Sequence, residues 1–376
     1  MGASAKKIAL VTDWITVMGG GEKVVEQFHK LYPEAPIYTS YCADRWRPWL
    51  DNKVVTGYLQ HWPFSALRRF LPVLRQWWFA QLDLSDFDII ISITGNGEAK
   101  FVRTTKDQTH ICYCHTPPHF YWAQYNEYLK RPSMRPYWLA RLGLRLLVKP
   151  LRKRDYAAAQ TVDHFIANST AIQADIKRYY DQDSMVIFPP INLDQFTPLA
   201  RAAEKHTIPS VPNCIWWGRI VPAKRLDIAI EACNQLNLPL TIIGSGPALD
   251  ELKKLAGPTI SFPGYVSDEE RESLIRSADL FIFPANEDFG IAPIEALASG
   301  LPVVALKAGG ALDYIKDGQN GVFIPEQNTE SLVGSLQAVV GKTFKPLTIT
   351  TSAERFSKDN FKRNIKRLVQ SSILKI

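Results

Sequence analysis

Residues 214–244 read CIWWGRIVPAKRLDIAIEACNQLNLPLTIIG. The stretch begins and ends with short, continuous apolar runs, CIWWG and LTIIG. Such runs, with little polar alternation, are typical of parallel strands that helices cover on both faces. Between them we expect a polar turn and then a helix over Leu226–Leu236. The stretch therefore predicts a strand, a helix and a second, parallel strand.

The same alternation runs through the whole chain. In the first half the expected strands are Ile8–Thr12, Ile89–Ile93, His110–His115, His164–Ser169 and Met185–Pro190. In the second half, besides Cys214–Gly218 and Leu240–Gly244, they are Ile260–Gly264, Leu280–Pro284, Pro302–Leu306 and Val322–Pro325. The polar, proline-bearing stretch Asn192–Pro212 separates the halves.

This pattern predicts an α/β protein with two doubly wound, Rossmann-like domains that face each other across a cleft. In such sheets ligands bind at the carboxyl ends of the strands. We place the domains at residues 1–195 and 196–355, and we expect the C-terminal helix, residues 356–376, to join the first domain.

Composition excludes several classes of protein. The chain has 376 residues, of which 46% are hydrophobic and 22% charged, and this indicates a soluble protein of two globular domains. No window approaches the roughly 20 apolar residues of a membrane span, and we expect no secretory signal at the start, since Ile8–Thr12 reads as a first strand. The five scattered cysteines favour reduced thiols in a cytosolic protein. Between His61 and Gln160, 15 Lys and Arg outnumber 7 Asp and Glu, so nucleic acid or an anionic membrane is a possible partner.

Two turns after expected strands of the second half have the composition of a phosphate site. Gly218, Arg219 and Lys224 follow one strand, and the two cations can converge on a single anion such as a nucleotide diphosphate. Gly244 opens the next turn, Gly-Ser-Gly-Pro, where a ligand can approach closely. A solvated basic turn and a plain tight turn are the alternatives. Neither turn is the G-x-G-x-x-G fingerprint, which weighs against a dehydrogenase.

The stretch EDFGIAPIE carries two glutamates eight residues apart, Glu287 and Glu295. Pro293 suits the first turn of a helix, which would place Glu295 in that turn and Glu287 in the preceding loop. Carboxylates accept hydrogen bonds from sugar hydroxyls, and amides at a helix start donate to sugar or phosphate oxygens. The amides expected to do so belong to Phe289, Gly290 and Ile291. The alternatives are a glutamate that only favours the helix start and an exposed loop acid.

Together these turns resemble the family 4 retaining glycosyltransferases, whose signature E-x7-E occurs here as E-D-F-G-I-x-P-x-E-A. The resemblance implies the GT-B fold and a donor site in the second domain. Arg219 and Lys224 would bind the donor diphosphate, Glu287 and the amides of Phe289, Gly290 and Ile291 the hexose, and Glu295 the nucleotide ribose. Val266, in the loop Gly264-Tyr265-Val266, would border the base. A later glycine-rich turn, Gly309-Gly310-Ala311-Leu312-Asp313, also matches, but Asp313 stands where the family commonly has Glu and is left out of the site.

The first half adds a glycine turn and a histidine. Gly19, Gly20 and Gly21 lie at a strand-to-helix turn, where the backbone can approach a phosphate or sugar closely. The resemblance places this turn over the donor phosphates and His115, in ICYCHTPP, against the donor sugar. A ligand-free loop and a core histidine are the alternatives. Cys112 and Cys114 beside His115 lack zinc-ligand spacing and a second ligand pair, so we expect no metal.

Two basic, aromatic segments, Ser65–Gln81 and Tyr137–Arg154, have the composition of helices that lie in a membrane interface. Pro72 and Pro150 are expected to keep either from forming one long, straight helix. A core-facing helix with a solvated basic face is the alternative, and no nucleic-acid-binding motif accompanies the charge. The residues predicted to contact the membrane or the acceptor are Arg68, Arg69, Arg75, Trp77 and Trp78.

Within the family, the chain resembles bacterial mannosyltransferases of surface-polysaccharide and O-antigen assembly, through D-W-I-T-x-x-G-G-x-E-K-V and I-C-Y-C-H-T-P. This implies a cofactor- and metal-independent enzyme that transfers mannose from GDP-mannose to a lipid-linked glycan, peripheral to the cytoplasmic face of the membrane. The catalytic residues would be His115, Glu287, Arg219 and Lys224, the last two stabilising the leaving diphosphate. A UDP-hexose enzyme, a non-catalytic membrane-associated scaffold and a same-fold sugar-nucleotide epimerase are the alternatives.

Overall fold

The computed structural model describes residues 6–17, 19–68, 71–130, 136–196 and 206–373. It divides the chain into two compact units, Met1–Pro190 with Phe361–Ile376 and Ile191–Asn360. Both divisions lie five residues from the predicted boundaries at 195 and 355. The reason is a backbone contact within the second unit: Ile191 forms a β-bridge with Ser357 and donates its N–H to the carbonyl of Phe356 at 2.9 Å.

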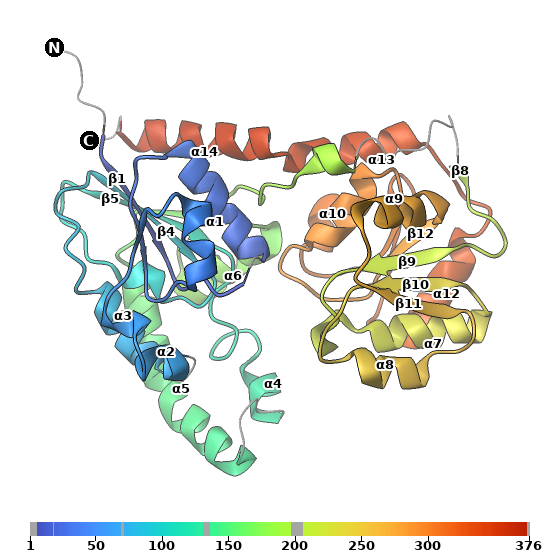
Figure 1. The fold of residues 1–376 in the computed structure, drawn as a ribbon, viewed down its shortest axis with the longest axis horizontal. Coiled ribbons are helices and arrows are strands. Elements are labelled where there is room, and N and C mark those ends of the chain that lie inside the picture. Colours follow the sequence, from blue (N-terminus) through green and yellow to red (C-terminus); the bar gives the residue numbers. More distant parts are fainter. Residues whose placement is uncertain (1–5, 18, 69–70, 131–135, 197–205, 374–376) are drawn as a thin grey trace. The chain divides into compact units, whose positions relative to one another are not determined.

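The first unit is built on a parallel sheet with the strand order β3-β2-β1-β4-β5-β6-β7 (Figure 1). Its strands are β1 (Ile8–Thr12), β2 (Ile37–Thr39), β3 (Val54–Val55), β4 (Ile89–Thr94), β5 (Thr109–Cys114), β6 (His164–Ala167) and β7 (Ser184–Val186). Its helices are α1 (Gly20–Leu31), α2 (Phe64–Leu67), α3 (Pro72–Phe79), α4 (Tyr125–Lys130), α5 (Tyr137–Ala159), α6 (Thr170–Tyr180) and, from Phe361 on, α14 (Lys358–Ile373). The short strands β2 and β3 were not predicted.

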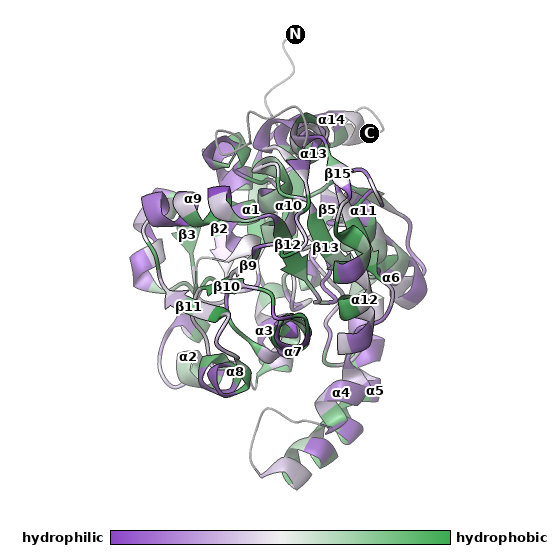
Figure 2. Ribbon diagram, turned by 90° about the vertical axis from the view of Figure 1, so that its right-hand side faces the viewer, coloured by the Kyte–Doolittle hydropathy of each residue, from purple (hydrophilic) through white to green (hydrophobic). Residues whose placement is uncertain are grey.

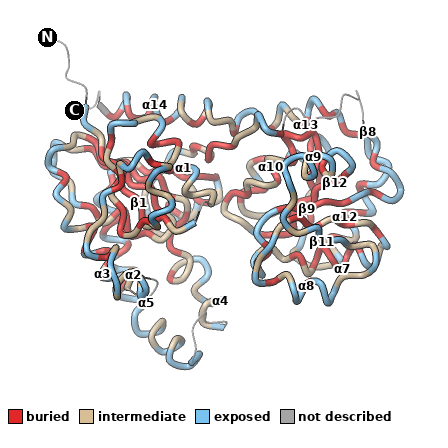
Figure 3. Tube along the Cα trace, in the orientation of Figure 1, coloured by how far each residue is buried: buried red, intermediate tan, exposed pale blue. Residues whose placement is uncertain are grey.

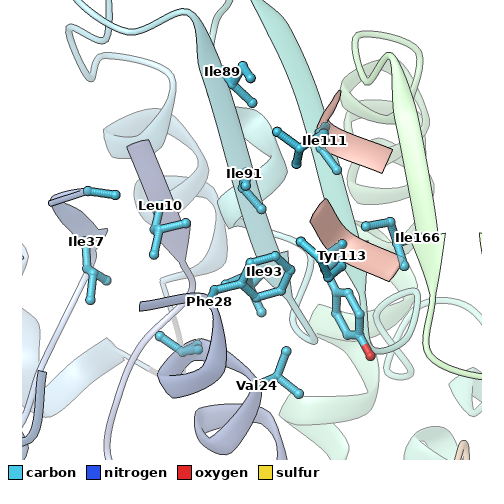
Figure 4. Close-up of a cluster of buried hydrophobic side chains, with 14 of the residues drawn as sticks. Leu10, Val24, Phe28, Ile37, Ile89, Ile91, Ile93, Ile111, Tyr113 and Ile166 are labelled. Atoms are coloured by element: carbon cyan, nitrogen blue, oxygen red, sulfur yellow. The ribbon is translucent and has the colours of Figure 1, made fainter. Parts of the chain in front are cut away.

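One face of this sheet is covered by the first helix and the C-terminal helix. Leu10, Ile91 and Ile111 of the sheet belong to one buried cluster with Val24 and Phe28 of α1 (Figure 4). α14 adds four apolar side chains to the same cluster: Phe361, Ile365, Leu368 and Val369. The rings of Phe28 and Phe361 meet edge to face, 5.3 Å apart.

The second unit is built on a parallel sheet with the order β11-β10-β9-β12-β13-β14. Its strands are β9 (Cys214–Trp217), β10 (Leu240–Ile243), β11 (Ile260–Gly264), β12 (Leu280–Phe283), β13 (Val303–Leu306) and β14 (Gly321–Ile324). Its helices are α7 (Leu226–Leu236), α8 (Leu249–Leu255), α9 (Asp268–Ser277), α10 (Ile291–Ala298), α11 (Ala311–Tyr314), α12 (Thr329–Val339) and α13 (Pro346–Ala353), and β8 (His206–Thr207) pairs with β15 (Thr343–Phe344).

Both sheets are parallel, and their strands are mostly buried while the outer turns of the helices are exposed (Figure 3). The strand order of the second sheet reverses between β9 and β12, which is where doubly wound sheets bind ligands. The predicted α/β class with two doubly wound, Rossmann-like sheets is confirmed.

Pro72 and Pro150 behave differently. Pro72 begins α3, so Ser65–Gln81 does not form one helix, as predicted. α5, however, continues through Pro150, so the break expected there does not occur. Proline removes a hydrogen bond to the carbonyl four residues earlier, here that of Leu146. Leu146 is exposed, so water can reach this part of the helix. No helix within the described ranges is long and apolar enough to cross a membrane.

Candidate functional site

Three turns at the carboxyl ends of β9, β10 and β11 pack against one another. Gly218 donates its N–H to Ile243 at 3.0 Å, and Gly244 donates to Gly264 at 2.8 Å. Gly218 and Gly244 have φ values of 145° and 131°, and a Cβ on Gly244 would lie 2.0 Å from the carbonyl oxygen of Gly218. These positions therefore require glycine. Val266, half-buried, lies two residues beyond β11, next to the same strand ends.

The turn after β9 carries the two predicted diphosphate ligands. Arg219 is exposed and has no hydrogen-bond or ion-pair partner among the described residues. Lys224, in the short 3-10 helix Pro222–Lys224, forms an ion pair with Glu287. Its ammonium also lies 5.7 Å from the ring centre of Phe283. The structure thus joins the basic turn to the acidic loop after β12.

A second glycine turn holds the loop that contains Glu287. Gly310 donates its N–H to the carbonyl of Glu287 at 2.8 Å, and a Cβ on Gly310 would lie 2.2 Å from the carbonyl oxygen of Phe289. Phe289 is buried against Tyr314. Gly290 has a φ of 91° and caps α10. The sequence had shown this turn as a match to the family's later glycine-rich turn and left Asp313 out of the site, but it assigned no role to Gly309 or Gly310.

Glu295 lies two residues deeper in its helix than predicted. α10 begins at Ile291, not at Pro293, because a proline within the first turn removes an N–H that has no partner inside the helix anyway. Glu295 is thus in the second turn, where its Oε2 accepts a hydrogen bond from Nε1 of Trp217 at 2.9 Å. Trp217 is the last residue of β9. It was not predicted to belong to the site, because its position in the sequence does not indicate a contact with Glu295.

In the first unit, Gly21 and His115 line a small cavity of about 120 Å³, whereas Gly19 and Gly20 do not line it. A Cβ on Gly21 would lie 3.5 Å from Nε2 of His115. Gly20 and Gly21 are already the first residues of α1, so only Gly19 precedes the helix, and its N–H donates to Glu22 at 3.1 Å. The expected glycine loop is therefore mostly a helix start.

Asp13 also lines that cavity and holds the loop after β4 in place. Its buried carboxylate accepts hydrogen bonds from the hydroxyl of Thr94 and from the N–H groups of Gly95, Asn96 and Ala99, at 2.7 to 2.9 Å. This fixes the loop after β4, from which Asn96 lines the cavity beside His115. No such role was predicted for Asp13, because a lone acid after the first strand carries no signal of these contacts.

Comparison with known families identifies the chain. Residues 18–195 match the model "Glycosyltransferase Family 4", and residues 202–360 match "Glycosyl transferases group 1". The chain belongs to these glycosyltransferases.

Two curated relatives illustrate the range of activities around this glycosyltransferase. It is 31% identical over 193 residues to the D-inositol 3-phosphate glycosyltransferase of Streptomyces bingchenggensis, covering 44% of this chain and 42% of the relative. It is 26% identical over 195 residues to the GDP-mannose-dependent alpha-(1-6)-phosphatidylinositol monomannoside mannosyltransferase of Mycolicibacterium smegmatis, covering 46% and 51%. The chain thus spans only about half the length of the curated relatives it matches.

Solved structures show the fold. HepE of Anabaena, in complex with UDP and glucose, superposes with a TM-score of 0.65 at 18% identity, covering 98% of this chain and 100% of HepE. Sucrose-phosphate synthase of Thermosynechococcus elongatus superposes with a TM-score of 0.66 at 17% identity, covering 99% and 100%. The glycosyltransferase therefore has the predicted GT-B fold.

Two of the five residues predicted to contact a membrane, Arg75 and Trp78, lie in the interior of the glycosyltransferase. Arg75 is buried, donates to Glu98 at 2.6 Å and lies over the ring of Trp14. Burial raises the pKa of Glu98 to about 8, although Arg75 opposes this. Trp78 is buried in the core beside Phe79. The prediction was wrong for Arg75 and Trp78, because each has an interior partner that segment composition does not reveal.

The other three members of that set differ. Trp77 is half exposed. Arg68 is half-buried, with its guanidinium 4.8 Å from the ring centre of Tyr41. Arg69 lies outside the described residues. Within the part of the chain that the structure describes, no group of three or more His, Cys, Asp or Glu side chains could hold a metal ion.

The second basic segment is the more exposed one. α5 extends away from the sheet of its unit (Figures 1 and 2). Its inner side is buried through Val148, Leu151 and Asp155. Its outer side exposes apolar side chains to between 46% and 67%: Trp138, Leu139, Leu142, Leu146 and Leu147. Three exposed cations lie on or beside the same side: Arg145, Lys149 and Lys153.

Proposed function

We propose that the chain transfers a hexose, with retention of configuration, from a nucleotide diphosphate sugar to the hydroxyl of a lipid-linked glycan, and that the donor is GDP-mannose. The observation that carries the proposal is the placement of four side chains at neighbouring strand ends. Arg219 and Lys224 follow β9, Glu287 follows β12, and Glu295 lies in the next helix, α10. Lys224 pairs with Glu287, and Glu295 accepts from Trp217 of β9. The GDP-mannose-dependent relative of M. smegmatis supports this donor.

Each group has a distinct part in the proposed reaction. Arg219 and Lys224 bind the diphosphate, Glu287 accepts from hexose hydroxyls, and Glu295 accepts from the ribose. Breaking the anomeric C–O bond builds positive charge on the sugar and negative charge on the departing diphosphate. The two cations and the amides at the start of α10 stabilise that negative charge, so no divalent cation or cofactor is needed.

The acceptor oxygen attacks the face from which the diphosphate departs, and the departing phosphate oxygen takes its proton. In the first unit, His115 and the start of α1 line a cavity suited to hydroxyl groups of the sugar or acceptor. The fixed loop after β4 gives that cavity a constant shape.

A thermal-shift screen tests the donor. GDP-mannose and GDP are expected to raise the melting temperature, while UDP-glucose, UDP and ADP-glucose leave it unchanged. A response to the uridine nucleotides alone would replace GDP-mannose by a UDP-hexose, the alternative favoured by the binding of UDP and glucose to HepE. No response to any nucleotide would refute the donor site. The anomeric configuration of the product, measured by NMR, tests retention.

We further propose that the enzyme meets its acceptor as a peripheral protein on the cytoplasmic, anionic face of a membrane. The exposed apolar side chains of α5 and the cations beside them have the two properties that hold a helix in an anionic interface. Leu142 and Leu146 would enter the acyl boundary, while Lys149 and Lys153 meet lipid phosphates.

Vesicle sedimentation tests this surface. The wild-type chain is expected to pellet with phosphatidylglycerol vesicles but not with phosphatidylcholine vesicles, and less so at high salt. Lys149→Glu with Lys153→Glu should reduce binding several-fold. Lys253→Glu with Lys254→Glu, the same charge change on the exposed side of α8 in the second unit, is the matched control. Equal binding by wild type and both double variants would exclude α5 as the lipid-binding surface.

A further inference from the structure

We infer that Trp14 and Asn96 form a binding site for a neutral pyranose, the sugar residue of the acceptor glycan that receives the hexose. The inference rests on the proposed function in one respect, since the acceptor is a glycan there. It names the chemical class of ligand that the first unit recognises, and it assigns that recognition to two residues that have no part in the proposed reaction.

Trp14 is a half-buried aromatic residue just after β1, and it lines the small cavity of the first unit. The buried guanidinium of Arg75 lies over its ring, 4.4 Å from the ring centre, so the indole meets the cavity with its other face or its edge. Trp46 and Trp122 of the same unit donate their indole N–H groups within the chain, whereas the N–H of Trp14 has no partner among the described residues. Trp14 therefore offers a ligand both an aromatic surface and a hydrogen-bond donor.

Asn96 supplies the second group of the site. It lies in the loop after β4, lines the same cavity, and uses its backbone N–H to donate to Asp13 at 2.7 Å. Its half-buried carboxamide has no hydrogen-bond partner in the part of the chain that the structure describes. Because a carboxamide both donates and accepts hydrogen bonds, it suits the neighbouring hydroxyl groups of a sugar.

A buried ion pair fixes these two groups relative to each other. Glu98, two residues after Asn96 in the same loop, accepts from Arg75 at 2.6 Å, and both side chains are almost fully buried. Such a pair is costly to desolvate and gives little net stability. Here it holds the ring of Trp14 and the loop of Asn96 in one arrangement, and a site that is already ordered loses less entropy when a ligand binds.

The charge and size of the cavity favour a neutral sugar. Among the described residues that line it, Asp13 and Glu22 carry carboxylates and none is a lysine or an arginine, so a phosphate would meet negative charge. Its volume of about 120 Å³ is below the roughly 300 Å³ of a small-molecule site. The cavity therefore takes in one edge of the sugar, and the ring of the sugar lies on Trp14. The donor hexose has its proposed polar partners in the second unit, which leaves this site for the acceptor.

Saturation-transfer NMR tests the inference with the methyl pyranosides of mannose, glucose, galactose and N-acetylglucosamine. The wild-type chain is expected to bind at least one of them, with the strongest transfer to the hydrogens on one face of the ring, because stacking brings only that face to the indole. Trp14→Ala should weaken this binding about tenfold through the lost aromatic contact, and Asn96→Ala about threefold to tenfold through the lost hydrogen bonds. Trp62→Ala, which removes an 82% exposed tryptophan of the same unit, is the control and should leave binding unchanged.

Asn96→Ala keeps the test decisive if Trp14→Ala does not fold, because its carboxamide has no partner among the described residues to lose. Unchanged sugar binding in the folded variants, or wild-type binding of none of the glycosides, overturns the inference. Displacement of the bound glycoside by the nucleotide sugar of the donor screen assigns the cavity to the donor hexose and also overturns it. In each case a melting temperature that still rises with nucleotide leaves the proposed function standing. A wild-type chain that binds neither glycoside nor nucleotide overturns both.

Discussion

Replacing Trp217 by phenylalanine is expected to weaken donor binding without unfolding the second unit. The Nε1 of Trp217 donates to Oε2 of Glu295 at 2.9 Å, and its ring packs 4.4 Å from that of Phe281. Phenylalanine keeps much of this apolar contact but has no N–H to donate. The change therefore acts mainly on the orientation of the Glu295 carboxylate.

The magnitude follows from the kind of bond that is lost. A hydrogen bond to a charged group contributes about 1.5–3 kcal/mol to stability. Glu295 is half-buried, so water replaces part of this contribution and the lower end of the range applies. If the indole holds the carboxylate ready for the ribose, about 1.4 kcal/mol of donor binding is lost, which is a tenfold higher Kd.

Isothermal titration with the donor nucleotide measures this Kd, and thermal unfolding reports on the fold. Trp216→Phe is the matched control, because Trp216 is buried on the same strand and its indole N–H has no hydrogen-bond partner among the described residues. It should lower the melting temperature and leave the Kd unchanged. An unchanged Kd in Trp217→Phe, or an equal increase in both variants, would refute the reasoning.

Three further results are expected. Gly310→Ala places a Cβ 2.2 Å from the backbone oxygen of Phe289, so it should lower the free energy of unfolding, measured by chemical denaturation, by about 1–3 kcal/mol and weaken donor binding. Gly334→Ala is the control, because a Cβ at this helical position meets no atom within 4 Å, and it should be neutral or stabilising. Burial lowers the pKa of His110 from 6.5 to about 4, so the unfolded chain takes up a proton that the native chain does not, and stability should fall by about 3 kcal/mol as the pH drops through this range. His110→Gln should be less acid-sensitive in urea unfolding at pH 7 and 4.5; an identical loss would contradict the assignment. Chelation by EDTA should leave the transfer rate unchanged, and a loss restored by Mg²⁺ would show that a cation is required.

The strands of both sheets could be predicted because parallel strands buried on two faces need continuous apolar runs, and those runs are visible in the chain. β2 and β3 were missed because strands of three and two residues are too short to show a pattern. The placement of Lys224 and Glu287 at strand ends was predictable for the same reason. Trp217 and Asp13 were not, since each acts through a partner that only the fold brings near: Glu295 for Trp217 and the loop after β4 for Asp13.

The two basic, aromatic segments show why composition does not identify a surface. Both have the residue types of an interfacial helix, but the guanidinium of Arg75 meets Glu98, 23 residues away in the chain, and this buried pair joins α3 to the loop after β4. On α5 the one acid, Asp155, is also buried and accepts from Lys100 and Tyr180, and the cations of the outer side have no interior partner among the described residues. A buried partner that is distant in the sequence, which composition does not show, thus distinguishes Arg75 from the exposed cations of α5. Vesicle binding by variants that change the exposed cations of α5 and keep Arg75 therefore measures the loss of a binding surface without disturbing the core.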